Sequence, residues 1–79
     1  MQRSKDIIEE YRNIYGEEGL QIAYNKMVDL IIEYIGKYRG YDSYEYRYYV
    51  NLTKYEKNKE GRLYEISRMY DELISFKLL

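Results

Sequence analysis

Tyrosine is the residue type in this sequence whose side chain is best suited to binding, and it is concentrated in one short segment. The 79 residues include thirteen tyrosines, one phenylalanine and no tryptophan. Six of the tyrosines lie within residues 38–50, which read YRGYDSYEYRYYV. A tyrosine ring offers a large contact surface at a small loss of side-chain entropy, and its hydroxyl can make a hydrogen bond in water or at an interface. The segment therefore predicts a surface that binds another macromolecule.

The residue types that most often carry catalysis or bind metals are missing. The sequence has no cysteine and no histidine, which excludes disulfides, thiolate zinc sites and imidazole bases. The adjacent carboxylates Glu9 and Glu10 would diverge by about 100° on a helix and would not share a proton. The serines have no histidine to activate them, and the five glycines form no phosphate-binding loop. We predict a protein that is not an enzyme and that holds no cofactor or metal.

Charge is distributed unevenly along the chain, although the formal net charge is only −1. Residues 1–33 hold four basic and seven acidic side chains, whereas residues 34–62 hold seven basic and four acidic ones. The basic side chains that lie among the tyrosines are Lys37, Arg39, Arg47, Lys54, Lys57, Lys59 and Arg62. Bases of a single-stranded nucleic acid stack on such rings while cations contact the phosphates. Nucleic-acid binding through residues 37–62 is therefore the alternative function, although no known nucleic-acid-binding motif accompanies the segment.

The length of the chain predicts one helical domain over residues 1–79, close to the smallest size that a hydrophobic core can stabilise. Folds of this size often need disulfides, metals or partner subunits. The lack of cysteine excludes disulfides, and the lack of cysteine and histidine removes the commonest metal ligands, so a homodimer is expected. No apolar run approaches the length of a membrane span, and residues 1–10 lack the apolar core of a signal peptide. We therefore predict a cytoplasmic protein without a membrane partner.

Hydrophobic spacing predicts helices over three parts of the chain. Residues 4–15 carry one apolar stripe, with Ser4 placed to cap the helix, and Gly16 placed to end it. Residues 19–38 carry a wider stripe, which favours packing on more than one neighbour. Residues 62–76 carry a third stripe on one face. The apolar residues of these stripes are Ile7, Ile8, Tyr11, Ile14, Tyr15, Leu20, Tyr24, Met27, Val28, Ile31, Ile35, Tyr38, Leu63, Ile66, Tyr70, Leu73 and Ile74.

The segment 42–58 fits two kinds of secondary structure. Alternating apolar and polar residues over 44–53 are typical of a half-buried strand. The same residues also fit a helix that begins with Asp42 and Glu45 in a capping-box arrangement. A strand needs a partner, and the nearest candidate, residues 62–67, belongs to a better helical pattern. We therefore predict an all-α bundle of about four helices, with an α+β fold containing a strand over 44–55 as the alternative.

The tyrosines are expected to divide between core and surface. Tyr11, Tyr15, Tyr24 and Tyr70 lie on the predicted apolar stripes and are expected to pack in the core. In the third helix, Tyr41, Tyr44, Tyr48, Leu52 and Tyr55 fit one helical face, of which Tyr44, Tyr48, Leu52 and Tyr55 are expected to be buried. Tyr46 and Tyr49 lie off that face, so we expect them to project into solvent and anchor a partner, supported by Arg47 and Tyr41.

The preferred function is binding to another protein. Small regulators and inhibitors encoded by viruses and mobile elements often have this size and lack active-site residues, and by this analogy we expect a regulator or inhibitor. The partner-binding residues that we predict are Tyr38, Arg39, Tyr41, Tyr44, Tyr46, Arg47, Tyr49 and Lys54.

Overall fold

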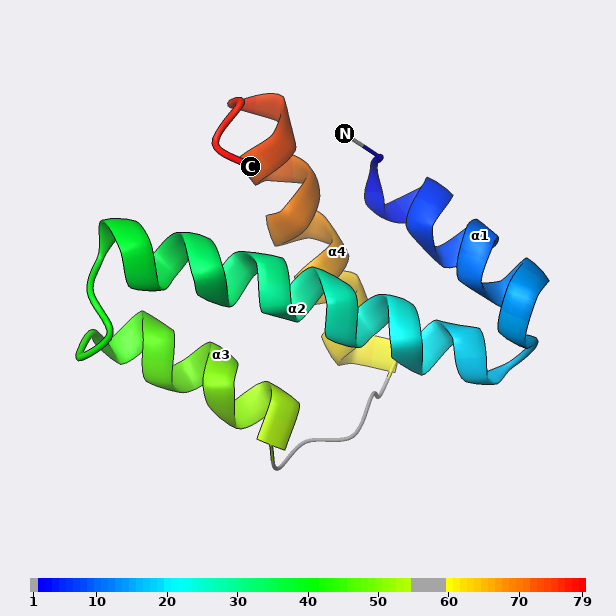
Figure 1. Cartoon of the computed structure of the whole chain (residues 1–79), viewed down its shortest axis with the longest axis horizontal. Helices are drawn as coiled ribbons and strands as arrows, with labels where there is room; N and C mark the ends of the chain where they lie inside the picture. The colour runs from blue at the N-terminus through cyan, green and yellow to red at the C-terminus, as the bar shows by residue number, and fades with distance from the viewer. Residues whose placement is uncertain (1, 55–59) are drawn as a thin grey trace.

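The computed structural model describes residues 2–54 and 60–79, and these ranges contain four helices and no strand (Figure 1). The helices are α1 (Ser4–Tyr15), α2 (Glu18–Tyr38), α3 (Tyr44–Lys54) and α4 (Glu60–Ser75). The predicted all-α bundle is confirmed. The alternative strand over 44–55 is wrong, because residues 44–54 are helical. The predicted bounds are within two residues of those observed, except that the expected extension of the third helix over 55–58 lies outside the described residues.

Helix α2 is the central element, because α1, α3 and α4 all pack on it. In Figure 1, α3 lies along one side of α2, and α1 and the C-terminal half of α4 lie on the other. The prediction that the wide stripe of α2 packs on several neighbours is therefore confirmed. Its buried residues are Gly19, Ala23, Tyr24, Met27, Val28, Ile31, Ile35 and Gly36. None of the helices in the described part of the chain is long and apolar enough to cross a membrane.

The core that α2 organises contains aliphatic and tyrosine side chains. Tyr24 and Tyr70 are fully buried in it, as predicted, together with Ile7 from α1 and Ile66 from α4. The Tyr70 hydroxyl donates a hydrogen bond to the Gln2 carbonyl oxygen at 2.9 Å. One face of α2 is thus buried within one chain, whereas Leu30, Ile32 and Tyr34 are only partly buried and Tyr38 is exposed. The expected homodimer stays a prediction.

Ser4 does not cap α1 in the predicted way. The helix is preceded by Arg3, which makes no capping hydrogen bond, and Ser4 is buried inside the first turn. The Ser4 hydroxyl donates to Asp71 Oδ2 at 2.6 Å, and the Ser4 backbone N–H donates to Asp71 Oδ1 at 2.8 Å. The Asp71 carboxylate of α4 therefore accepts the hydrogen bonds of the first residue of α1. The two residues are 67 positions apart, so local sequence could not indicate this contact.

Two glycines permit close packing and a sharp turn between α1 and α2. Gly16 has φ 69°, and its N–H donates to the Arg12 carbonyl oxygen at 2.9 Å, so it ends α1 as predicted. At Gly19, in the first turn of α2, a Cβ would collide with the Tyr11 backbone. The two helices can approach this closely only because residue 19 has no side chain.

Helix α3 begins with a different cap from the one predicted. The Ser43 hydroxyl accepts a hydrogen bond from the Tyr46 N–H at 3.2 Å, which is the geometry of a serine that precedes a helix. The predicted capping box of Asp42 and Glu45 is therefore wrong, and the helix starts at Tyr44.

Candidate functional site

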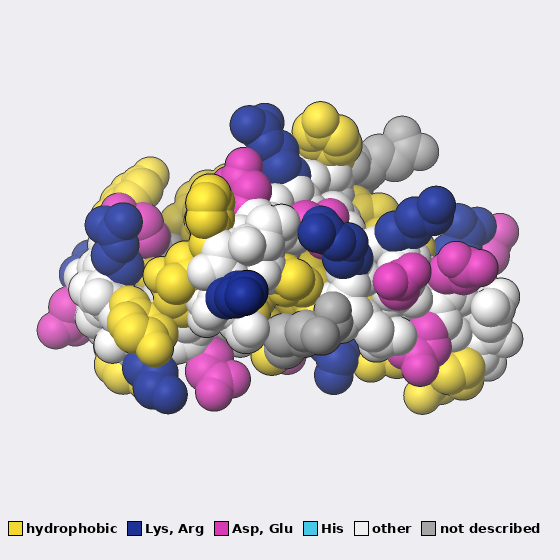
Figure 2. Space-filling model, turned by 90° about the horizontal axis from the view of Figure 1, so that it is seen from above, with side chains coloured by type: hydrophobic (Ala, Val, Ile, Leu, Met, Phe, Trp, Pro, Cys, Tyr) yellow, Lys and Arg dark blue, Asp and Glu magenta, His cyan; other side chains and the backbone are white. Residues whose placement is uncertain are grey.

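Three tyrosines at the junction of α2 and α3 are mostly exposed. Tyr38 ends α2, Tyr41 lies in the turn and Tyr44 begins α3, and their exposed fractions are 67, 65 and 79 %. These three residues are termed the junction tyrosines. In the view of Figure 2, hydrophobic side chains lie among acidic and basic ones at the left end of the molecule, where α2 passes into α3. All three were predicted to bind a partner.

Two of the junction tyrosines are held by a second ring. The Tyr38 ring lies 4.8 Å from the Tyr34 ring at an interplanar angle of 37°, and the Tyr41 ring lies edge-on to Tyr46 at 5.1 Å and 82°. Tyr34 and Tyr46 are half-buried and pack against the core. Aromatic pairs at these distances attract each other beyond simple area burial. The exposed rings are therefore positioned by the core rather than left to rotate freely.

Gly36 makes room for the Tyr41 ring. A Cβ at residue 36 would lie 2.5 Å from Cε1 of Tyr41 and 2.9 Å from its Cδ1. The ring thus lies directly on the backbone of α2 while most of its surface faces solvent. Glycine has a low helix propensity and weakens the last turns of a helix. Here its lack of a side chain lets the exposed Tyr41 ring pack against α2.

The turn between α2 and α3 is fixed by hydrogen bonds. Gly40 has φ 98°, and its N–H donates to the Ile35 carbonyl oxygen at 3.2 Å. Arg47 Nη2 donates to the carbonyl oxygen of Asp42 at 3.2 Å, which joins α3 to the turn. Arg39 and Arg47 are both exposed beside the junction tyrosines. The side chain of Lys54, also predicted to bind a partner, lies outside what the structure describes.

The expected orientation of α3 is wrong. Tyr49 was predicted to project into solvent, but it is only 8 % exposed and belongs to the core, and Tyr46 is half-buried. Tyr44, which was assigned to the buried face, is exposed instead, whereas Tyr41, which was expected beside the projecting rings, is exposed. Tyrosines occupy both faces of this helix, so their spacing cannot indicate which face packs on α2. Tyr49 is therefore withdrawn from the predicted partner-binding residues.

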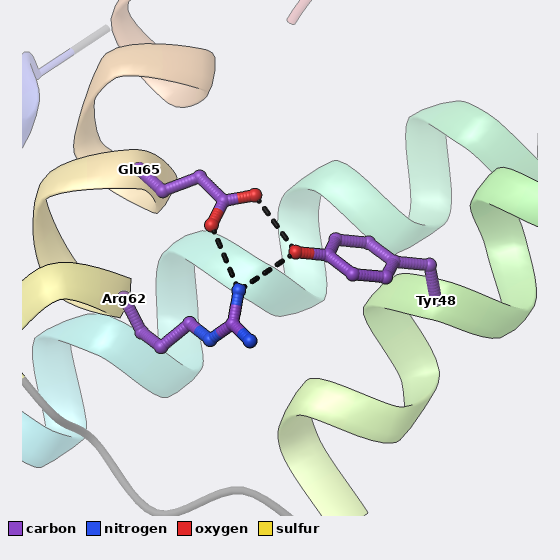
Figure 3. A network of polar contacts seen from close by, with 3 residues as sticks. All are labelled: Tyr48, Arg62 and Glu65. Atoms are coloured by element: carbon purple, nitrogen blue, oxygen red, sulfur yellow. Dashed lines mark hydrogen bonds and ion pairs between the residues drawn. The ribbon is translucent and has the colours of Figure 1, made fainter.

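The middle of α3 is joined to α4 by a polar network (Figure 3). The Tyr48 hydroxyl donates to Glu65 Oε1 at 2.9 Å and accepts from Arg62 Nη1 at 2.9 Å. Arg62 Nη1 also pairs with Glu65 Oε2 at 3.1 Å. Over their described residues, α3 and α4 do not pack closely on each other. The network therefore bridges two helices that each pack mainly on α2. No spacing or motif in the sequence indicates that Tyr48 pairs with Glu65.

The pKa of the Tyr48 phenol is raised in the folded chain. Burial raises the pKa of Tyr48 above its ordinary value of 10.0, the hydrogen bond and charge of Glu65 raise it further, and Arg62 opposes them. Burial also raises the pKa of Tyr49 and of Tyr70. A phenol with a raised pKa is a poor base and a poor nucleophile near neutral pH. In the structure the Tyr48 and Tyr70 hydroxyls make hydrogen bonds, and Tyr49 and Tyr70 pack in the core.

The surface has shallow hollows. A hollow of about 230 Å³ adjoins the junction and is lined by Leu30, Glu33, Tyr34, Lys37, Tyr38, Leu78 and Leu79. A larger open hollow of about 770 Å³ lies at α1 and α4, with Ile8, Arg12 and Ser67 in its lining. No group of three metal-ligating side chains occurs within residues 2–54 and 60–79.

Comparison with known proteins gives no relative from which a function could be transferred. The sequence matches no protein-family model, and neither the curated proteins nor the solved structures contain a significant match. The residues and their geometry are thus the sole basis for a functional proposal.

Proposed function

We propose that this protein is a small, non-enzymatic regulator or inhibitor that acts by binding another protein through the junction tyrosines. The observation that carries this proposal is the exposure of Tyr38, Tyr41 and Tyr44 on a surface where two of the rings are already held in place. Tyrosine is enriched among the residues that dominate binding energy at protein interfaces. A ring that is fixed before binding loses less entropy when a partner covers it.

The polar groups around the junction support a protein partner more than a nucleic acid. Arg62, one of the basic residues of the alternative nucleic-acid site, is already bonded to Tyr48 and Glu65. Asp42 and Glu45 are exposed next to the tyrosines and would repel phosphates. A rim of mixed charge around exposed rings is typical of a protein-binding surface. An origin in a virus or mobile element and a cytoplasmic location, suited by the lack of cysteine, belong to the same proposal.

The proposal can be tested with a matched pair of variants. Tyr41→Ser/Tyr44→Ser removes two exposed rings from the junction, and Tyr64→Ser removes one from α4, where Tyr64 is 71 % exposed. Neither variant should change helicity or melting temperature appreciably, because surface substitutions usually change stability by less than about 0.5 kcal/mol. We expect the double variant to weaken partner binding by about 2 kcal/mol or more, and the control to bind normally.

The measurement is a pull-down from source lysate with and without nuclease, followed by affinity determination for the captured protein at two salt concentrations. A protein partner anchored by tyrosines should survive nuclease and respond modestly to salt. Loss of capture after nuclease, with a steep fall of affinity as salt rises, would indicate nucleic-acid binding instead. Normal binding by the double variant would show that the junction is not the contact surface.

A further inference from the structure

The end of α1 and the start of α2 form a second exposed apolar site. Ile14 and Tyr15 were expected to pack in the core, but they are 61 and 52 % exposed. Residues 9–18 also contain four glutamates and one arginine, all exposed. Residues 9–18 are termed the acidic end. Exposed apolar side chains rimmed by charge are typical of an interaction surface.

The acidic end and the junction tyrosines lie at opposite ends of α2. The helix has 21 residues, so its length is about 32 Å at 1.5 Å per residue. Figure 1 shows the turn between α1 and α2 at the right and the turn between α2 and α3 at the left. The two surfaces cannot meet within one chain, but they can meet between two copies.

Their charges are complementary. The junction segment, residues 37–47, holds Lys37, Arg39 and Arg47 against two acidic side chains, whereas the acidic end has an excess of three negative charges. Complementary potentials favour the encounter of two such surfaces and fix their orientation.

We propose that the acidic end of one copy binds the junction tyrosines of another copy, so that Ile14 and Tyr15 pack against Tyr41 and Tyr44. This rests on the proposed function of the junction, because it names a second copy of the chain as an occupant of that surface. The contact joins two different surfaces, so each bound pair retains one unoccupied surface of each kind. Assembly then extends beyond the dimer as concentration rises, and it weakens as salt screens the opposite charges.

The test uses two variants with one surface altered in each. Ile14→Ser/Tyr15→Ser alters the acidic end, and Tyr41→Ser/Tyr44→Ser alters the junction. Sedimentation or light scattering from about 1 μM to about 1 mM covers the range of weak self-association. The wild type should increase in mass with concentration, and each variant alone should associate at least about tenfold more weakly. An equimolar mixture of the two variants should recover association, because one supplies an intact junction and the other an intact acidic end.

The outcomes separate this inference from the proposed function. A wild type that stays monomeric over the whole range overturns the inference, while the pull-down result for the junction is unaffected. Association that is lost in the junction variant but kept in the acidic-end variant shows that a copy docks elsewhere, and also overturns it. Variants that lose association alone and do not recover it when mixed show a contact between identical surfaces, which overturns it as well. Circular dichroism of both variants confirms that they remain folded.

Discussion

The tyrosines of the core and the tyrosines of the junction are the same residue type in opposite environments. Tyr24 and Tyr70 are enclosed by the helices, whereas Tyr38, Tyr41 and Tyr44 are mostly exposed. What differs is the packing around each residue: α1, α3 and α4 all pack on α2, whereas Tyr38, Tyr41 and Tyr44 lie where α2 ends and α3 begins. Tyrosine tolerates both positions because its ring is apolar and its hydroxyl is polar. Position within the bundle therefore decides whether a tyrosine is buried in the core or exposed at the surface.

The largest effect that would sharpen this comparison is expected at the centre of the core. Tyr24→Ser removes a fully buried ring and leaves a cavity between α2 and its neighbours. Loss of a buried aromatic side chain typically lowers the free energy of unfolding by about 3 to 5 kcal/mol. Urea denaturation of Tyr24→Ser beside Tyr44→Ser measures the contrast. Equal stability of the two variants would show that the division between core and junction is mistaken.

A smaller effect is expected at Tyr48, which lies between the two environments. Tyr48→Phe removes the hydroxyl that joins Glu65 and Arg62, and we expect a loss of about 1 kcal/mol, typical of one partly exposed hydrogen-bonding group. The pKa of Tyr48 is higher in the folded chain than its ordinary value of 10.0. The associated stability is thus complete below about pH 10 and is lost as pH rises through the folded-state pKa.

Denaturation at several pH values above neutrality checks the Tyr48 prediction. Stability of the wild type should fall at alkaline pH, and the fall should be shallower for Tyr48→Phe because one titrating group has been removed. Glu65→Gln should also make it shallower, since the charge that helps to raise this pKa is gone. An alkaline fall of the same steepness in all three proteins would contradict a role for the network.

The smallest effect on stability is expected for Gly36→Ala, which should weaken partner binding without lowering the free energy of unfolding. Alanine is favoured over glycine in a helix by about 1 kcal/mol, so Gly36→Ala should leave the unfolding free energy unchanged or slightly raised once Tyr41 has moved. The added Cβ would displace the Tyr41 ring from its seat. We expect weaker partner binding by a protein that is no less stable. Retained affinity would show that the position of this ring does not matter for the partner.

Sequence spacing was sufficient to predict α1, α2 and α4, because each carries its own apolar stripe, whereas α3 was predicted to be a helix only because a strand there would have no partner. It could not orient α3, where tyrosines on both faces give two equivalent stripes and Tyr49 rather than Tyr44 reaches the core. It also failed at the end of α1, where Ile14 and Tyr15 continue the stripe beyond the point at which α2 and α4 cover it. The exposure of a residue on a regular stripe depends on where neighbouring helices stop, and that is a property of the tertiary structure.

The candidate site was predictable in part for the same reason. The location of the surface followed from the clustering of tyrosines over 38–50, and Tyr38, Tyr41 and Tyr44 are exposed there. Which rings would face solvent, and the support that they receive from Tyr34 and Gly36, depended on contacts between α2 and the following turn. Such contacts have no periodic signal in the sequence.

The hydrogen bonds between Ser4 and Asp71 have a consequence for the order in which the chain folds. They close a loop of nearly the whole chain, since 67 positions separate the two residues. Closing a long loop costs more chain entropy than forming neighbouring contacts such as those between α1 and α2. We therefore expect the hydrogen bonds between Ser4 and Asp71 to form late in folding, after α1 and α3 have packed on α2. Once formed, these hydrogen bonds link the first helix directly to the last, in addition to the packing of both helices on α2.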